Sequence, residues 1–117
     1  MAKQYKRGKQ LTAAVGSLRM DNDVGKVTTG FFDAVVPLLK ENGEPVQSRT
    51  YGNDLFHLKM RDLQTEEEMI YWADGGIRGA LKMAKVLAGT AIEIVHTGQK
   101  KIEDGTVQTY DIFALEG

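Results

Sequence analysis

The segment 56–61, FHLKMR, alternates between apolar and basic residues. Such alternation predicts a β-strand that buries one side and exposes the other. The exposed side would carry His57, Lys59 and Arg61. Cations on a strand surface can bind the phosphates of a nucleic-acid backbone, and aromatic rings nearby can stack on unpaired bases. The basic side of this segment is therefore a candidate surface for a single-stranded nucleic acid.

Further cations and rings lie in the neighbouring segments. Arg49 and Tyr51 precede the basic strand, and Tyr71 and Trp72 follow it in a run of bulky residues. We expect Tyr51 and Tyr71 to be exposed and to stack on bases, although burial is the alternative for both. We expect the ring of Trp72 in the core, where most large aromatic side chains lie, with a place in the binding surface as its alternative. The candidate DNA-binding residues are Lys40, Arg49, Tyr51, His57, Lys59, Arg61, Tyr71, Trp72, Lys100 and Lys101.

The sequence contains no recognisable catalytic or metal-binding set. It has no cysteine and two histidines, and its carboxylates follow no known ligand spacing, so we expect no metal and no cofactor. Neither serine, Ser17 or Ser48, stands in a nucleophile motif. Gly75 and Gly76 stand at the start of a predicted helix but belong to no phosphate-binding motif. We therefore expect a protein that is not an enzyme.

Length and charge indicate the number of domains, the location of the protein and its possible partners. A chain of 117 residues with 42% hydrophobic and 26% charged positions suits one domain. It lacks the roughly 18–20 consecutive apolar residues of a membrane span, so we expect a cytoplasmic protein with no membrane contact. Residues 1–20 hold five Lys or Arg and no acid, leaving ten basic and sixteen acidic residues in 21–117. This basic segment could follow a polyanion or be only a solvated arm.

Periodicity predicts five strands and one helix in residues 26–117. Asn42-Gly43 favours a tight turn, Asp74 can cap the helix start, and Gly89 can end the helix in the left-handed conformation. Residues 1–25 form either a basic arm or an extra N-terminal strand. The strands are expected at 27–39, 46–61, 69–73, 90–97 and 106–115, and the helix at 75–88.

This order, with the helix between the third and fourth strands, is typical of the five-stranded OB-fold barrel. An OB barrel binds its ligand across the second and third strands. Two loops flank that surface, and here they would be 40–45 with Lys40 and 98–105 with Lys100 and Lys101. We therefore predict an OB-fold domain over 26–117.

Trp72 is followed by AlaAspGlyGly, an alanine- and leucine-containing helix, LAGTAIEIVHTGQKK and GTVQTYDIFALE. Over about residues 26–116 this pattern resembles small phage-encoded single-stranded DNA-binding proteins of OB fold, and is closest to those of lactococcal siphophages. The resemblance implies sequence-independent binding of single-stranded DNA during phage DNA replication or recombination, in the host cell cytoplasm. It also implies contacts with host or phage recombination or replication proteins. The bacterial single-stranded DNA-binding protein ends in a disordered acidic tail that recruits other proteins. Residues 111–117 instead look like a strand, so we do not expect recruitment through such a tail.

The sequence leaves two functions open, a DNA-binding protein and a protein-interaction module. A single short binding face gains affinity when two copies are linked, so we expect a homodimer that binds single-stranded DNA. The alternative is an OB-like protein-interaction or virion assembly module that does not bind DNA. The near-neutral charge favours this alternative, whereas the cations and tyrosines of the second and third strands favour DNA binding. The fold alone cannot separate the two.

Overall fold

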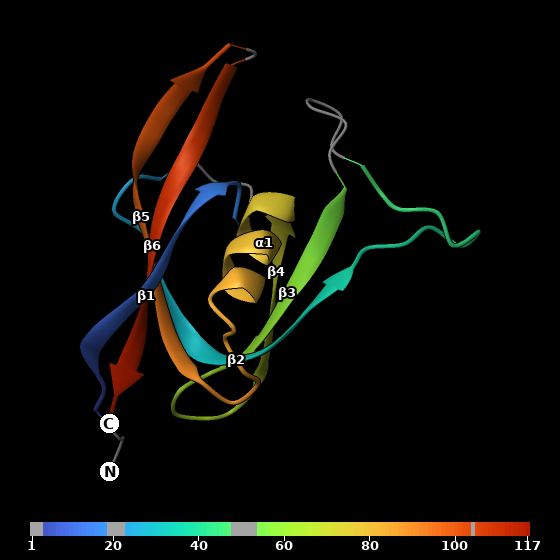
Figure 1. Cartoon of the computed structure of the whole chain (residues 1–117). Helices are drawn as coiled ribbons and strands as arrows, with labels where there is room; N and C mark the ends of the chain where they lie inside the picture. Colours follow the sequence, from blue (N-terminus) through green and yellow to red (C-terminus); the bar gives the residue numbers. More distant parts are fainter. Residues whose placement is uncertain (1–3, 19–22, 48–53, 104) are drawn as a thin grey trace.

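The protein is built mainly from β-strands. The computed structural model describes residues 4–18, 23–47, 54–103 and 105–117. Within these residues there are six strands and one helix, which confirms the predicted all-β class with one helix. In chain order they are β1 (Lys6–Gly16), β2 (Val27–Pro37), β3 (Leu55–Arg61), β4 (Glu68–Asp74), α1 (Gly75–Met83), β5 (Ala91–Ile102) and β6 (Gly105–Glu116) (Figure 1).

The strands form one antiparallel sheet in the order β1-β6-β5-β2-β3-β4. Continuous strand pairing does not close this sheet, and β1 and β4 are its edges. The chain after β1 reaches the other edge at one point, where Leu18 forms an isolated bridge with Ala73 and the N–H of Asp74 donates to the carbonyl of Ser17 at 3.1 Å. The strands therefore curve around α1 (Figure 1).

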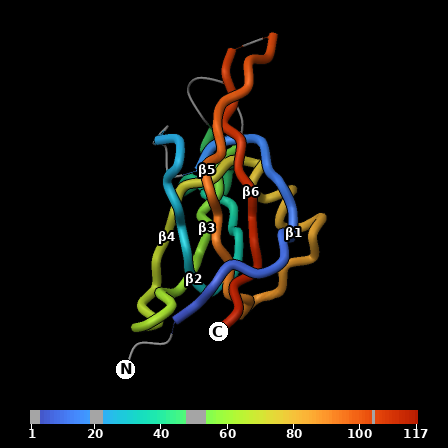
Figure 2. Tube along the Cα trace, turned by 90° about the vertical axis from the view of Figure 1, so that its left-hand side faces the viewer, coloured from blue at the N-terminus to red at the C-terminus, as the bar shows by residue number. Residues whose placement is uncertain are grey.

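β1 comes from the segment for which the sequence allowed either an arm or an extra strand. Lys6–Gly16 pairs with β6, and the register shifts between Arg7 and Thr12. Figure 2 shows β1 running beside β6, while the β5–β6 hairpin extends beyond the rest of the sheet. Lys6, Arg7 and Lys9 are thus carried on an edge strand.

The core lies on the side of the sheet that faces α1. Alternate residues of each central strand point to that side, which confirms the predicted burial of Leu58 and Met60. Burying one such side chain contributes roughly 1.5–3 kcal/mol, so these residues determine which strand faces point outward. The largest fully buried side chains are Leu58, Met60, Ile77, Leu81, Ile92, Ile94 and Ile112.

The two ends of α1 compare differently with the sequence prediction. The carboxylate of Asp74 accepts the backbone N–H groups of Gly76 (3.0 Å) and Ile77 (3.4 Å), which confirms the predicted cap. The helix ends at Met83 rather than at residue 88, because Lys85 adopts a left-handed conformation (φ 55°).

The chain leaves α1 through a Schellman turn, in which the N–H of Lys85 donates to Lys82 and the N–H of Val86 donates to Leu81. This turn directs Val86 onto the core. Gly89, expected to end the helix, lies in the following turn with φ 90°, and its N–H donates to the carbonyl of Phe32 at 2.6 Å.

The connection from β2 to β3 is longer than predicted. Residues 38–47 form a small hairpin, and its turn at Asn42-Gly43 is confirmed by the bond from the N–H of Gly43 to the carbonyl of Lys40 (2.9 Å). The expected strand 46–61 therefore begins only at Leu55. This hairpin projects away from the sheet (Figure 1).

Candidate nucleic-acid interface

The pairing of β3 with β4 decides which aromatic side chain of β4 is exposed. Trp72 pairs with His57, and Tyr71 pairs with the fully buried Leu58. Directly paired residues share a face of the sheet, so Trp72 points outward and Tyr71 points to the core. The exposed fraction of Trp72 is 44%, whereas Tyr71 packs against the core and its hydroxyl donates to the sulfur of Met69 at 3.3 Å.

The expectation that Trp72 lies in the core is therefore wrong, and Tyr71 is not an open stacking platform. The physical reason is that residues 69–73, MIYWA, are apolar or aromatic on both faces. A one-residue shift in register exchanges the faces of a strand, and only its partner decides between them.

The outward side chains of β3 and β4 form one continuous surface, which we call the β3–β4 face. The rings of His57 and Trp72 have centroids 6.4 Å apart and are tilted by 53°. Ile70, 48% exposed, pairs with Lys59, so an apolar side chain and a cation lie side by side next to the ring pair. The face consists of His57, Lys59, Arg61, Glu68, Ile70 and Trp72.

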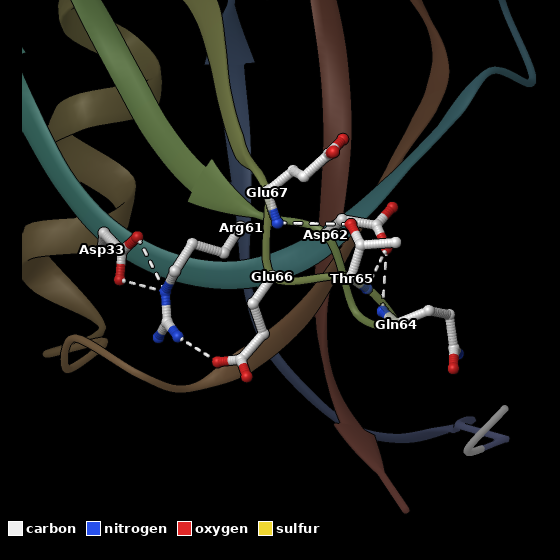
Figure 3. Close-up of polar contacts among 7 residues, drawn as sticks. All are labelled: Asp33, Arg61, Asp62, Gln64, Thr65, Glu66 and Glu67. Carbon is white, nitrogen blue, oxygen red and sulfur yellow. Dashed lines mark hydrogen bonds and ion pairs between the residues drawn. The ribbon is translucent and has the colours of Figure 1, made fainter. Parts of the chain in front are cut away.

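Carboxylates accompany the cations of this face. The Nε of Arg61 lies 3.0 and 3.1 Å from the two carboxylate oxygens of Asp33, and its Nη1 lies 2.6 Å from Glu66 (Figure 3). The guanidinium also lies over the ring of Phe31, 5.2 Å from its centroid. Lys59 forms a longer ion pair than Arg61 does, since its Nζ lies 4.0 Å from a carboxylate oxygen of Glu68. A phosphate would therefore reach Lys59 readily, but it would compete with carboxylates for Arg61.

The turn between β3 and β4 holds Glu66 beside Arg61. The carboxylate of Asp62 accepts the N–H groups of Thr65 (2.9 Å) and Gln64 (2.8 Å), and these bonds lower the pKa of Asp62 below its ordinary value (Figure 3). The N–H of Glu66 donates to the carbonyl of Asp62, and Glu66 itself has φ 59°. The turn thus places one carboxylate where a ligand phosphate would compete for the arginine.

Removing that competitor should strengthen binding of an anionic ligand. We expect Glu66→Gln to raise the affinity for single-stranded oligo-dT about two- to fivefold, because the Glu66–Arg61 pair is exposed and such pairs are worth up to about 1 kcal/mol. The matched control is Glu67→Gln, which removes the same charge from the same turn. Fluorescence titration of both variants measures the effect, and an equal gain in both would show that only net charge matters.

The other candidate residues lie away from the β3–β4 face. Lys40 is exposed on the 38–47 hairpin, while Lys100 and Lys101 lie near the tip of the β5–β6 hairpin. These two lysines belong to paired strand β5 rather than to the expected loop, because pairing with β6 continues to Ile102 and Gly105. Figure 1 shows the two hairpins as separate projections from the sheet. Arg49 and Tyr51 lie outside the described residues.

Sequence patterns alone did not single out Phe31 and Ile70 as surface residues of this region. In the structure Thr28, Gly30 and Phe32 are buried at alternate positions and leave Phe31 outward, but the residues of this segment show no matching apolar and polar alternation. Arg61, the partner of Phe31, is 30 positions away, and only the β2–β3 register shows that the two are adjacent.

Within the described ranges, no group of three or more His, Asp or Glu side chains is placed to hold a metal ion. No helix in that part of the chain is long and apolar enough to cross a membrane. Comparisons with protein-family models, characterised proteins and solved structures find no match to this chain. A functional assignment for this chain therefore depends on the geometry of the β3–β4 face and on the sequence pattern.

Proposed function

We propose that this protein binds single-stranded DNA on its β3–β4 face without catalysing a reaction. The observation that carries the proposal is the outward ring of Trp72, which pairs with His57, while Ile70 and Lys59 form the next outward pair of the two strands. Base stacking on an exposed ring tolerates every base, and a cation beside the ring can follow the backbone. This combination suits binding that does not depend on sequence.

The strand connectivity supports an OB-type arrangement with β1 as an added strand. β2 pairs with both β3 and β5, β3 pairs with β4, and α1 lies between β4 and β5 in the chain. In that arrangement β3 and β4 are the second and third OB strands, which form the ligand surface of this fold. The 38–47 hairpin and the β5–β6 hairpin then correspond to the two flanking loops.

The resemblance of residues 26–116 to phage-encoded single-stranded DNA-binding proteins supports the same function. On this proposal the protein coats transient single strands during phage DNA replication or recombination in the host cytoplasm, beside other replication or recombination proteins. We further propose a homodimer, because linking two short faces lets the second bind at high effective concentration. An interaction or virion assembly module is the alternative.

A titration with oligo-dT of about 30 nucleotides tests the proposal directly. Trp72 is the sole tryptophan of the chain, so its fluorescence reports on the proposed face itself. We expect a fluorescence change on binding, and an affinity that falls about 7- to 20-fold between about 50 and 200 mM salt if two or three phosphates are bound. A duplex of the same length should bind more weakly.

Failure to bind oligo-dT at micromolar protein and low salt would contradict the proposal and favour the interaction module. Binding with no change in Trp72 fluorescence would place the DNA elsewhere on the protein. The salt dependence also distinguishes phosphate contacts from purely apolar association, since only the former releases counterions.

A further inference from the structure

A hollow lies on the outer side of the sheet, beside the β3–β4 turn. It measures about 430 Å³ and lies between the start of the described chain and that turn. Tyr5 and Gln64 line the hollow together with Thr29 of β2 and Glu93 of β5, which pair with each other. Its volume is near the lower end for ligand pockets, so it suits one small planar group rather than a large ligand.

The carboxylate of Glu93 is held in a defined position at this hollow. Its Oε1 accepts from Nε of Arg7 at 2.7 Å and lies 2.6 Å from Nη2 of the same side chain. The guanidinium of Arg7 lies over the ring of Phe113, 4.2 Å from its centroid. A carboxylate has about four acceptor positions, so Glu93 retains capacity to accept an N–H from a group in the hollow.

The aromatic ring of Tyr5 lines the hollow. Tyr5 meets Phe31 edge to face, with ring centroids 6.1 Å apart. The other partner of Phe31 is the guanidinium of Arg61, which belongs to the β3–β4 face. The hollow therefore combines the ring of Tyr5 with a carboxylate acceptor.

The hollow and the β3–β4 face are connected through β2. Phe31 pairs with Arg61 on one side of β2, and Thr29, two residues along, pairs with Glu93 on the other side. Paired strands are about 4.8 Å apart, and residues two apart on one strand are separated by about 7 Å. A single strand of DNA that passes Trp72 and Arg61 can therefore continue across Phe31 to the hollow.

We propose that this hollow binds one base of the single strand and favours cytosine over thymine. Cytosine presents an N4 amino group that donates to the carboxylate of Glu93, whereas thymine presents the O4 acceptor at the same position. Two facing acceptors repel, so thymine loses this contact. The proposal rests on the proposed function and adds a composition preference at one subsite.

The test compares oligo-dC with oligo-dT of equal length on the wild-type chain and on Glu93→Gln. We expect the ratio of dC to dT affinity to fall about three- to tenfold in the variant, because the glutamine amide can donate to O4 as well as accept from N4. The control is Asp111→Asn on the outer side of neighbouring β6, whose carboxylate is bonded to Gln10 and does not line the hollow. Its dC to dT ratio should match the wild type.

Measuring a ratio separates this proposal from the general effect of freeing Arg7, which raises the affinity for both oligonucleotides alike. If both oligonucleotides bind and Glu93→Gln leaves the ratio unchanged, the base subsite is wrong while the proposed function stands. If neither binds the wild type, both are wrong. Should Glu93→Gln fail to fold, Glu93→Asp keeps the charge beside Arg7 but withdraws the carboxylate, and the same fall in ratio is expected.

Discussion

Replacing Trp72 by alanine should weaken oligo-dT binding about 5- to 150-fold while the protein keeps its cooperative thermal transition. The ring is 44% exposed on an edge strand, so its removal leaves no closed cavity. Stacking on an aromatic side chain is worth about 1–3 kcal/mol per base, which corresponds to this range of affinity. Because the variant has no tryptophan, anisotropy of a labelled oligonucleotide is the measurement. Trp72→Phe should retain most of the affinity.

The neighbouring residue supplies the matched variant. Tyr71→Ala removes a ring that packs on the core beside Leu58, so we expect it to lose about 3 kcal/mol of unfolding free energy. The affinity of the fraction that remains folded should change little. The opposite result would be that Tyr71→Ala weakens binding at normal stability while Trp72→Ala destabilises the fold. It would show that β4 pairs with β3 in a register shifted by one residue, with Tyr71 outward and Trp72 in the core.

Gly76→Ala should destabilise the protein by about 3 kcal/mol or more. A Cβ at Gly76 would lie 1.9 Å from the backbone carbonyl oxygen of Val15, so α1 and β1 would have to move apart. Overpacking against a neighbour costs about 1–3 kcal/mol and more when backbone must shift. Urea unfolding measures the loss. The movement would also disturb the contact through which Leu18 meets Ala73.

Gly79→Ala is the control within the same helix. A Cβ there meets nothing within 4 Å, and alanine favours a helix interior over glycine by about 0.8–1.0 kcal/mol. We therefore expect Gly79→Ala to be more stable than the wild type, with Gly76→Ala changing in the opposite direction. Equal stability of Gly76→Ala and the wild type would mean that β1 does not pack across the start of α1.

Features that depend on neighbours in the chain could be predicted from the residue pattern. The cap at Asp74 needs only the N–H groups two and three residues ahead, and the turn at Asn42-Gly43 needs only a residue that tolerates positive φ. The outward placement of Lys59 follows from the burial of Leu58 and Met60 on either side of it. In each case the deciding interaction is local, so the sequence contains it.

Features that depend on distant segments required the folded chain. The sequence of β4 is bulky on both faces, and only its pairing with β3 turns Trp72 outward and Tyr71 inward. Arg61 is a cation by sequence, but Asp33 becomes its partner only through the β2–β3 register. The hollow at Glu93 likewise requires β2, β5 and the start of the chain to meet. Register and long-range packing are set by the core as a whole, because shifting a strand by one residue would bury its outward side and expose its apolar side.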